Sequence, residues 1–206
     1  MLRYNIQAFT KDQLNAESTP ELYGQPEFVP WGFYDTRDMT TGFSALSFYA
    51  ATSNDIAVTN LQNPNTMPAN NYFRPFAYTL DWLIAATSTT SSAATPIVDD
   101  LLQIQARCIF QFNISNKLYI QVPISALHAS GGIYVSYQTG SPTGSGLGNY
   151  GMNWMPDGGY WVNGAWVLSP LNNFTCQVIA GTTTPTLVAT RSARITMWGP
   201  LARRVL

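Results

Sequence analysis

The residues of this chain that could carry out nucleophilic catalysis are few and far apart. His128 is the only histidine, and the two cysteines are Cys108 and Cys176. A serine or cysteine nucleophile needs a base beside it and a third group that orients the base. No G-x-S-x-G motif is present, and both cysteines lie in apolar, strand-like stretches where a thiol behaves as a small hydrophobic group. His128 therefore fits a turn histidine between "ISAL" and "ASGG" better than a catalytic base.

Carboxylate side chains are the other candidates for acid–base chemistry. Asp35 and Asp38 lie in "FYDTRDMT", and Asp99 and Asp100 are adjacent. A glycosidase needs two carboxylates that flank one groove. We expect Asp99 and Asp100 to precede a strand, and neighbouring residues of an extended chain point to opposite sides. They make a poor acid–base pair, and a hydrolase that uses Asp35, Asp38 or His128 is the last of our three hypotheses.

Metal and nucleotide chemistry have no support in the sequence. One histidine and two distant cysteines do not fill a structural zinc site. No glycine-rich phosphate loop follows a strand and opens a helix. We expect no catalytic residue, no metal and no cofactor.

Aromatic residues concentrate in a glycine-rich segment, 139–165, which we expect to be a long loop. Exposed aromatic rings on such a loop stack on sugar rings or anchor a protein interface. They could equally fold over the end of a barrel and complete its core, so interface, core lid and carbohydrate site all stay open. The residues are Tyr150, Trp154, Tyr160 and Trp161, with Trp166 just beyond.

Basic residues gather near the C-terminus in "RSAR" and "ARRVL". Four arginines, Arg191, Arg194, Arg203 and Arg204, are too few to package a genome by charge neutralisation. We predict no sequence-specific contact with nucleic acid. Arg203 and Arg204 are interface candidates, and the alternatives are contacts with lipid or nucleic-acid phosphates and pairing with the acidic N-terminal half.

The composition indicates a surface that neighbours cover. Charged residues make up 10 % of the 206 residues and the formal net charge is −1, whereas a typical chain has about 25 % charged residues. A solvated monomer normally keeps interspersed charges and a net charge away from zero. Residues 1–100 contain four Lys/Arg and ten Asp/Glu, and residues 101–206 contain six and one. These complementary halves pair within one fold or between copies.

The elements that must position these residues are strands. Apolar residues alternate through "LLQIQARCIFQFNIS", which predicts one long strand over 101–115, and "SNK" predicts a hairpin turn into "LYIQVPIS". We count about eight to ten strands and no helix pattern of ten or more residues, which indicates an all-β sandwich, barrel or jelly roll. Prolines at positions 20, 26 and 30 predict an extended N-terminal arm over 1–30, followed by one domain over 31–206.

The beginning of the sequence contains no apolar run long enough for a secretory signal. No stretch approaches 18 consecutive apolar residues, so we expect no transmembrane helix. The chain is expected to be made in the cytosol.

Two segments, "FQFNISNKLYIQVPISALHASGGIYV" and the C-terminal "ARITMWGPLARRVL", resemble the small jelly-roll capsid proteins of icosahedral phages with an internal membrane. In that family a K-x-Y-x-x-x-P-x-S-x-L stretch leads out of a barrel strand into a turn that contains glycine. The stretch is carried here by Lys117, Tyr119, Pro123, Ser125 and Leu127. The resemblance covers about a quarter of the chain.

The resemblance implies a single jelly roll, an eight-stranded β-barrel or sandwich with long loops and an extended N-terminal arm. It implies a structural protein of the virion, made in the host cytoplasm, that self-assembles into an icosahedral shell without catalysis. Its partners are then copies of itself, with a second capsid protein and an underlying lipid membrane left open. A strongly basic arm, usual in capsids that bind the genome, is absent.

The alternative hypothesis is a carbohydrate- or receptor-binding β-sandwich, such as a spike-like module. It would use Trp154, Tyr160 and Trp161 as platforms on which sugar rings stack.

Overall fold

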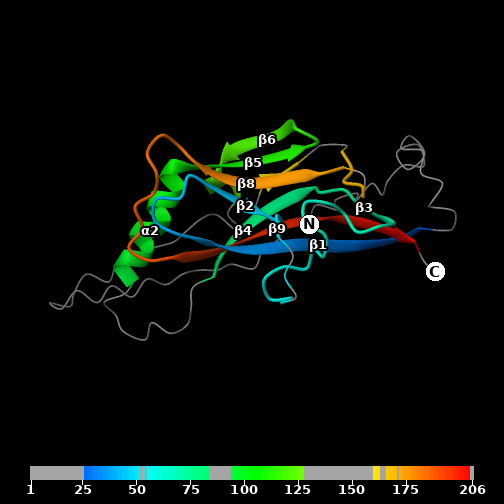
Figure 1. Ribbon diagram of the computed structural model, residues 1–206, viewed down its shortest axis with the longest axis horizontal. Coiled ribbons are helices and arrows are strands. Elements are labelled where there is room, and N and C mark those ends of the chain that lie inside the picture. The colour runs from blue at the N-terminus through cyan, green and yellow to red at the C-terminus, as the bar shows by residue number, and fades with distance from the viewer. Residues whose placement is uncertain are drawn as a thin grey trace, which may run out of the picture.

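The chain folds into a β-sandwich of two antiparallel sheets, with a helix at one end of the sandwich (Figure 1). The computed structural model describes residues 26–51, 53, 55–83, 94–127, 160–162, 166–170 and 172–204. One sheet has the order β1-β9-β4-β7, with β3 also paired to β9, and the other has the order β2-β8-β5-β6. The elements are β1 (Pro26–Met39), β2 (Ala45–Phe48), β3 (Asn71–Phe73), β4 (Ala77–Leu83), α2 (Ala94–Arg107), β5 (Cys108–Ile114), β6 (Lys117–Pro123), the short 3-10 helix η3 (Ile124–Leu127), β7 (Tyr160–Trp161), β8 (Phe174–Ala180) and β9 (Arg191–Arg204).

The core lies between the sheets and is rich in aromatic rings. Residues of β5 and β8 alternate between buried and part-exposed positions, as the period of two in a strand requires. The ring of Tyr78 in β4 packs 5.4 Å from that of Phe110 and 5.2 Å from that of Phe112, both in β5. These contacts join the two sheets, and full burial of one such side chain stabilises the fold by about 1.5–3 kcal/mol.

The predicted hairpin is confirmed. β5 and β6 pair antiparallel from Ile114 and Lys117 outward, and the two residues between them, Ser115 and Asn116, have φ angles of 47° and 68°. Two successive positive φ angles are those of a type I′ turn, whose twist matches that of the strands it joins. Pro123 is the last residue of β6, where the missing N–H costs no interior ladder bond.

The prediction of one strand over 101–115 and of no long helix was wrong. Residues 94–107 form the helix α2, and the strand begins only at Cys108. Leu101 and Ile104 are buried at helical spacing, whereas Leu102, which the strand pattern places in the core, is 49 % exposed. The apolar residues near positions 101–108 satisfy a period of two and a helical period at once, so the alternation alone did not distinguish them.

The helix is fastened to the connection between β8 and β9 by Asp100. This carboxylate is 1 % exposed and accepts hydrogen bonds from the backbone N–H of Val188 (2.7 Å) and Ala189 (3.3 Å) and from Nε of Arg191 (2.7 Å). It also forms an ion pair with Nη2 of Arg191 at 2.5 Å. We expected Asp99 and Asp100 to precede a strand directly, and this was wrong, because both lie in the helix α2.

β1 and β9 form an antiparallel ribbon of 14 residue pairs, which runs past the ends of most other strands in Figure 1. Residues 26–30 of the expected arm are the first residues of β1, and residues 1–25 lie outside the described residues. On its other edge, β1 exchanges hydrogen bonds with the segment 58–60 through the backbone of Tyr34 and Thr36. Even-numbered residues of β1 therefore direct their N–H groups away from β9, and Pro30, which has none, is accommodated there.

Candidate functional site

Part of the segment that we expected to be a loop is a strand. Tyr160 and Trp161 form β7, which pairs with Tyr78 and Ala77 of β4, so the loop prediction was wrong at these two positions. The reason is that β4 would otherwise leave its second edge unpaired. Tyr150, Trp154 and His128 lie outside the described residues.

Four aromatic side chains of the sheet that contains β1 and β9 are about two-fifths exposed: Phe28 (40 %), Trp31 (40 %), Trp161 (39 %) and Trp198 (42 %). Most of them border a groove with a volume of about 450 Å³, which we call the aromatic groove. Its walls include Phe28, Pro30, Trp31, Phe76, Trp198 and Pro200. The ring of Phe76 also stacks on that of Trp161, with centroids 5.4 Å apart and an angle of 15° between the planes.

The aromatic groove is built by two short sequences that pair with each other. In "PWG" of β1 and "WGP" of β9, Pro30 lies opposite Pro200, Trp31 opposite Gly199, and Gly32 opposite Trp198. Each indole thus lies across from a glycine, and because directly paired residues share a face, the two indoles lie on opposite faces of the ribbon. Only Gly32 makes room for the indole across from it. A Cβ atom at Gly32 would lie 2.9 Å from the Trp198 ring.

Trp198 is held in a fixed position. Its Nε1 donates a hydrogen bond of 3.0 Å to Oγ1 of Thr79 in β4. The register places Trp198, Ala77 and Trp161 in one row across β9, β4 and β7. The two tryptophans are therefore two strand spacings, or about 10 Å, apart on one face.

The prediction from sequence missed Phe28, Trp31, Phe76 and Trp198. The signal that could have found the two tryptophans is the occurrence of Trp-Gly beside proline in both "VPWG" and "MWGP". It became meaningful only once the two segments were seen to pair.

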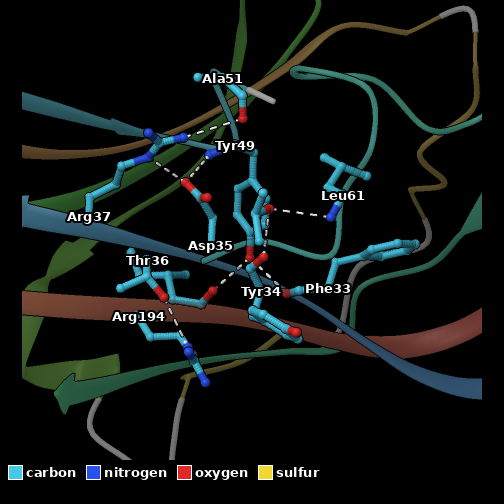
Figure 2. A network of polar contacts seen from close by, with 11 residues as sticks. Phe33, Tyr34, Asp35, Thr36, Arg37, Tyr49, Ala51, Leu61 and Arg194 are labelled. Atoms are coloured by element: carbon cyan, nitrogen blue, oxygen red, sulfur yellow. Dashed lines mark hydrogen bonds and ion pairs between the residues drawn. The ribbon is translucent and has the colours of Figure 1, made fainter. Parts of the chain in front are cut away.

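The candidate carboxylates do not form a catalytic pair. Asp35 is fully buried, and its Oδ2 accepts hydrogen bonds from Nε of Arg37 (2.6 Å) and from the backbone N–H of Tyr49 (2.7 Å), as Figure 2 shows. Burial raises the pKa of Asp35, and the hydrogen bonds from Tyr49 and Arg37 oppose that shift. Asp38 is exposed and accepts a hydrogen bond from the hydroxyl of Ser192. An odd and an even residue of one strand face opposite sides of the sheet, so the two carboxylates do not meet.

Tyr49 ties this network to both long strands. It has a φ of 62°, which is uncommon for a residue with a side chain. Its hydroxyl lies 2.8 Å from the carbonyl oxygen of Phe33 in β1 and 2.8 Å from that of Ile195 in β9. The network positions the beginning of the β2–β3 connection, and its carboxylate and phenol groups are buried.

Both cysteines are buried and unbridged. Burial raises the pKa of the Cys108 thiol to about 11 and raises that of Cys176 as well. Both are therefore protonated at neutral pH, and a thiol is a much weaker nucleophile than a thiolate.

Two of the arginines near the C-terminus form ion pairs with acidic residues of the N-terminal half, which was one of the alternatives left open from the sequence. Nε of Arg203 lies 2.7 Å from Oε2 of Glu27 in β1, and Arg191 pairs with Asp100. Arg194 donates to Oγ1 of Thr36 and its guanidinium lies 4.8 Å from the centre of the Tyr34 ring. Arg204 is the last residue of β9.

Among the described residues, no group of three or more His, Cys, Asp or Glu could hold a metal ion. In the same part of the chain, no helix is long and apolar enough to cross a membrane. Comparison with known proteins found no matching family model, no matching curated protein and no matching solved structure.

Proposed function

We propose that this chain is a structural subunit of a viral capsid, which self-assembles through its surfaces and catalyses no reaction. The proposal begins from the order in which its strands pair, and the low charge and the exposed aromatic side chains then favour a capsid among the functions of that fold.

The strand pairing supports a single jelly roll. With β3 set aside, the first of eight strands pairs with the last, the second with the seventh, the third with the sixth and the fourth with the fifth; these pairs are β1–β9, β2–β8, β4–β7 and β5–β6. Successive pairs alternate between the two sheets. One long antiparallel hairpin wrapped around a core gives this order, and jelly rolls have it.

The fold alone does not select a function, because jelly rolls occur in capsids, lectins and cupins. Two observations favour a capsid. Only 10 % of the residues are charged, and partly exposed aromatic side chains gather around one groove. Interface cores are depleted of charge and enriched in aromatic residues, so both observations suit a surface covered in an assembly.

The proposed partners are further copies of this chain. A second capsid protein and a lipid membrane are the additions to test, as the resemblance to capsid proteins of membrane-containing phages implies.

The test is the mass of the purified chain by light scattering over a range of protein and salt concentrations, followed by electron microscopy of any large species. We expect pentamers, hexamers or closed shells, alone or after addition of lipid vesicles. Trp198→Ser, at a position 42 % exposed in the aromatic groove, should weaken this assembly, whereas Val188→Ser, at a position 74 % exposed and outside that groove, should leave it unchanged. A chain that stays monomeric at every concentration with vesicles present would contradict the proposal.

The second candidate function is carbohydrate binding, and the aromatic groove is the observation that favours it. Its volume of about 450 Å³ lies within the range of about 300–1,000 Å³ that is typical of small-ligand sites. In that case the monomer should bind a glycan, and Phe28→Ala and Trp198→Ala, both in walls of the aromatic groove, should each weaken binding. A glycan array followed by titration calorimetry decides between the two functions.

A further inference from the structure

Among the residues that the structure describes, the outward positions of the sheet β2-β8-β5-β6 carry no charged side chain. Lys117, the first residue of β6, is exposed at the end of the sheet and pairs with Ile114, whose side chain faces the core. In β5 the residues between the buried ones point outward, and the same holds for β8. The burial pattern and the register of the four strands place these residues on the outer face: Ala45, Ser47, Ile109, Gln111, Asn113, Leu118, Gln121, Pro123, Thr175, Gln177 and Ile179. We call this surface the neutral face. The other sheet carries Asp38, Asp81 and Arg194 on its outer face.

The middle of the neutral face is a row of amides. Ser47, Gln177, Gln111 and Gln121 are aligned across β2, β8, β5 and β6. The Nε2 atom of Gln177 donates a hydrogen bond of 3.0 Å to Oγ of Ser47. A glutamine amide offers both donors and an acceptor, so a row of amides is complementary to a second copy of itself.

The rows on either side differ in polarity. Ala45, Ile179, Ile109 and Pro123 form an apolar row on one side of the amides. On the other side, Thr175, Asn113 and Leu118 are aligned, and Nδ2 of Asn113 donates to Oγ1 of Thr175 at 3.2 Å. Along the strands, the neutral face therefore changes from an apolar row at one end to a more polar row at the other.

We propose that the neutral face binds the neutral face of a second copy of this chain about a two-fold axis that runs parallel to the strands, midway between β8 and β5. This inference rests on the proposed self-assembly and names one of its contacts. The axis places Gln111 against Gln177 of the other copy and Ile109 against Ile179 of the other copy. An axis along the amide row would instead place Ile109 and Ile179 against Asn113 and Thr175, which pairs apolar with polar groups.

The chemistry of the face favours a second copy over other occupants. A nucleic acid or an anionic membrane needs basic side chains, and the outward residues of these strands include none. β5, β6 and β8 have seven residues each and β2 has four. With strands about 4.8 Å apart, the surface measures at most roughly 19 by 24 Å. That is smaller than the ~800 Å² per partner of a stable interface, so we expect a weak dimer that dissociates on dilution.

The test is a charge swap, measured by sedimentation velocity of the whole chain over a range of concentrations. Gln111→Lys and Gln177→Glu should each weaken the dimer at least about tenfold, because each brings an unpaired charge into the contact. An equimolar mixture should recover the dimer, since the axis places the new lysine of one copy against the new glutamate of the other. Gln62→Lys, at an exposed position in the β2–β3 connection, is the matched control and should behave like the parent chain. Far-ultraviolet circular dichroism establishes that each variant is folded.

Any of three results overturns the inference. The parent chain shows no dimer, either charge variant dimerises as strongly as the parent, or the equimolar mixture of the two variants does not recover the dimer. Electron microscopy of the same samples separates this failure from failure of the proposed function. Shells formed by the parent and equally by both variants would leave the capsid proposal standing without this contact. A dimer with charge-swap recovery but no larger species would keep the contact and remove the capsid proposal.

Discussion

Gly199 in β9 lies against the backbone of Arg74, in the segment that joins β3 to β4. A Cβ atom at position 199 would overlap the carbonyl oxygen of Arg74 and lie 2.8 Å from its carbonyl carbon. The backbone N–H of Arg74 donates a hydrogen bond of 3.1 Å to the carbonyl oxygen of Pro200. The chain therefore crosses itself at a distance that only glycine permits.

Gly199→Ala should consequently lower the free energy of unfolding by about 3 kcal/mol or more, because the atom it meets belongs to the backbone. Gly32→Ala is the matched comparison. Its Cβ meets the ring of Trp198, a side chain that can shift, so we expect a loss of about 1–2 kcal/mol. Urea unfolding followed by fluorescence measures both, and equal losses would contradict this account.

Removal of the Asp100 carboxylate should be among the most damaging single changes. Asp100→Ala leaves Arg191 and the N–H groups of Val188 and Ala189 without their acceptor, and breaking a buried ion pair from one side costs about 3–5 kcal/mol. Asp99→Ala, next to it but exposed, should change stability by less than about 0.5 kcal/mol. Thermal and urea unfolding of both variants provide the comparison.

Two buried tyrosines should differ in how much stability is lost with the hydroxyl. Tyr49→Phe removes the group that lies 2.8 Å from two backbone carbonyl oxygens and should cost about 1–2 kcal/mol. The hydroxyl of Tyr78 is buried, and its contact with the indole of Trp166 falls short of a full hydrogen bond, so Tyr78→Phe should cost at most about 0.5 kcal/mol. Similar losses in both variants would show that ring packing and not hydrogen bonding decides the result.

Asp35 should make stability depend on pH in the direction opposite to that of an ordinary ion-paired carboxylate. Burial raises the pKa of Asp35 above its ordinary value of 3.8, so as the pH falls the folded chain takes up this proton before the unfolded chain does. The contribution of Asp35 to the free energy of unfolding is therefore greatest below pH 3.8 and is lost as the pH rises through the raised pKa. The difference in free energy of unfolding between the parent and Asp35→Asn should grow in favour of the parent from neutral pH down to about pH 4. A difference that is constant or falls over this range would contradict it.

The sequence was most informative where one local signal determined one structure. The hairpin at Ser115 and Asn116 follows from a polar turn between two apolar strands. The boundary at Cys108 did not follow, because Ile104 and Cys108 fit a strand pattern with Leu102 and a helical pattern with Leu101. Only packing against the β8–β9 connection selects the helix. That connection is distant in sequence, and it is held through Asp100.

The candidate site was harder to predict because its residues come from segments far apart. Trp31 and Trp198 are separated by most of the chain and become neighbours only through the register of β1 and β9. Trp161 was identified from its local composition, but its role as a paired strand residue depends on β4. A long-range pairing of this kind leaves only a faint local signal, here the repeated Trp-Gly beside proline.

The prolines of β1 have a consequence for how copies of this chain can meet. Pro26 and Pro30 both occupy positions of β1 whose N–H groups would point away from β9. A strand of another molecule that approached this edge would meet two residues of β1 that have no N–H group to donate. Natural sheets discourage open-ended growth in this way. Crowded copies are thereby steered away from fibre-like stacking and toward contacts between side chains, which can be broken and remade until each copy is correctly placed.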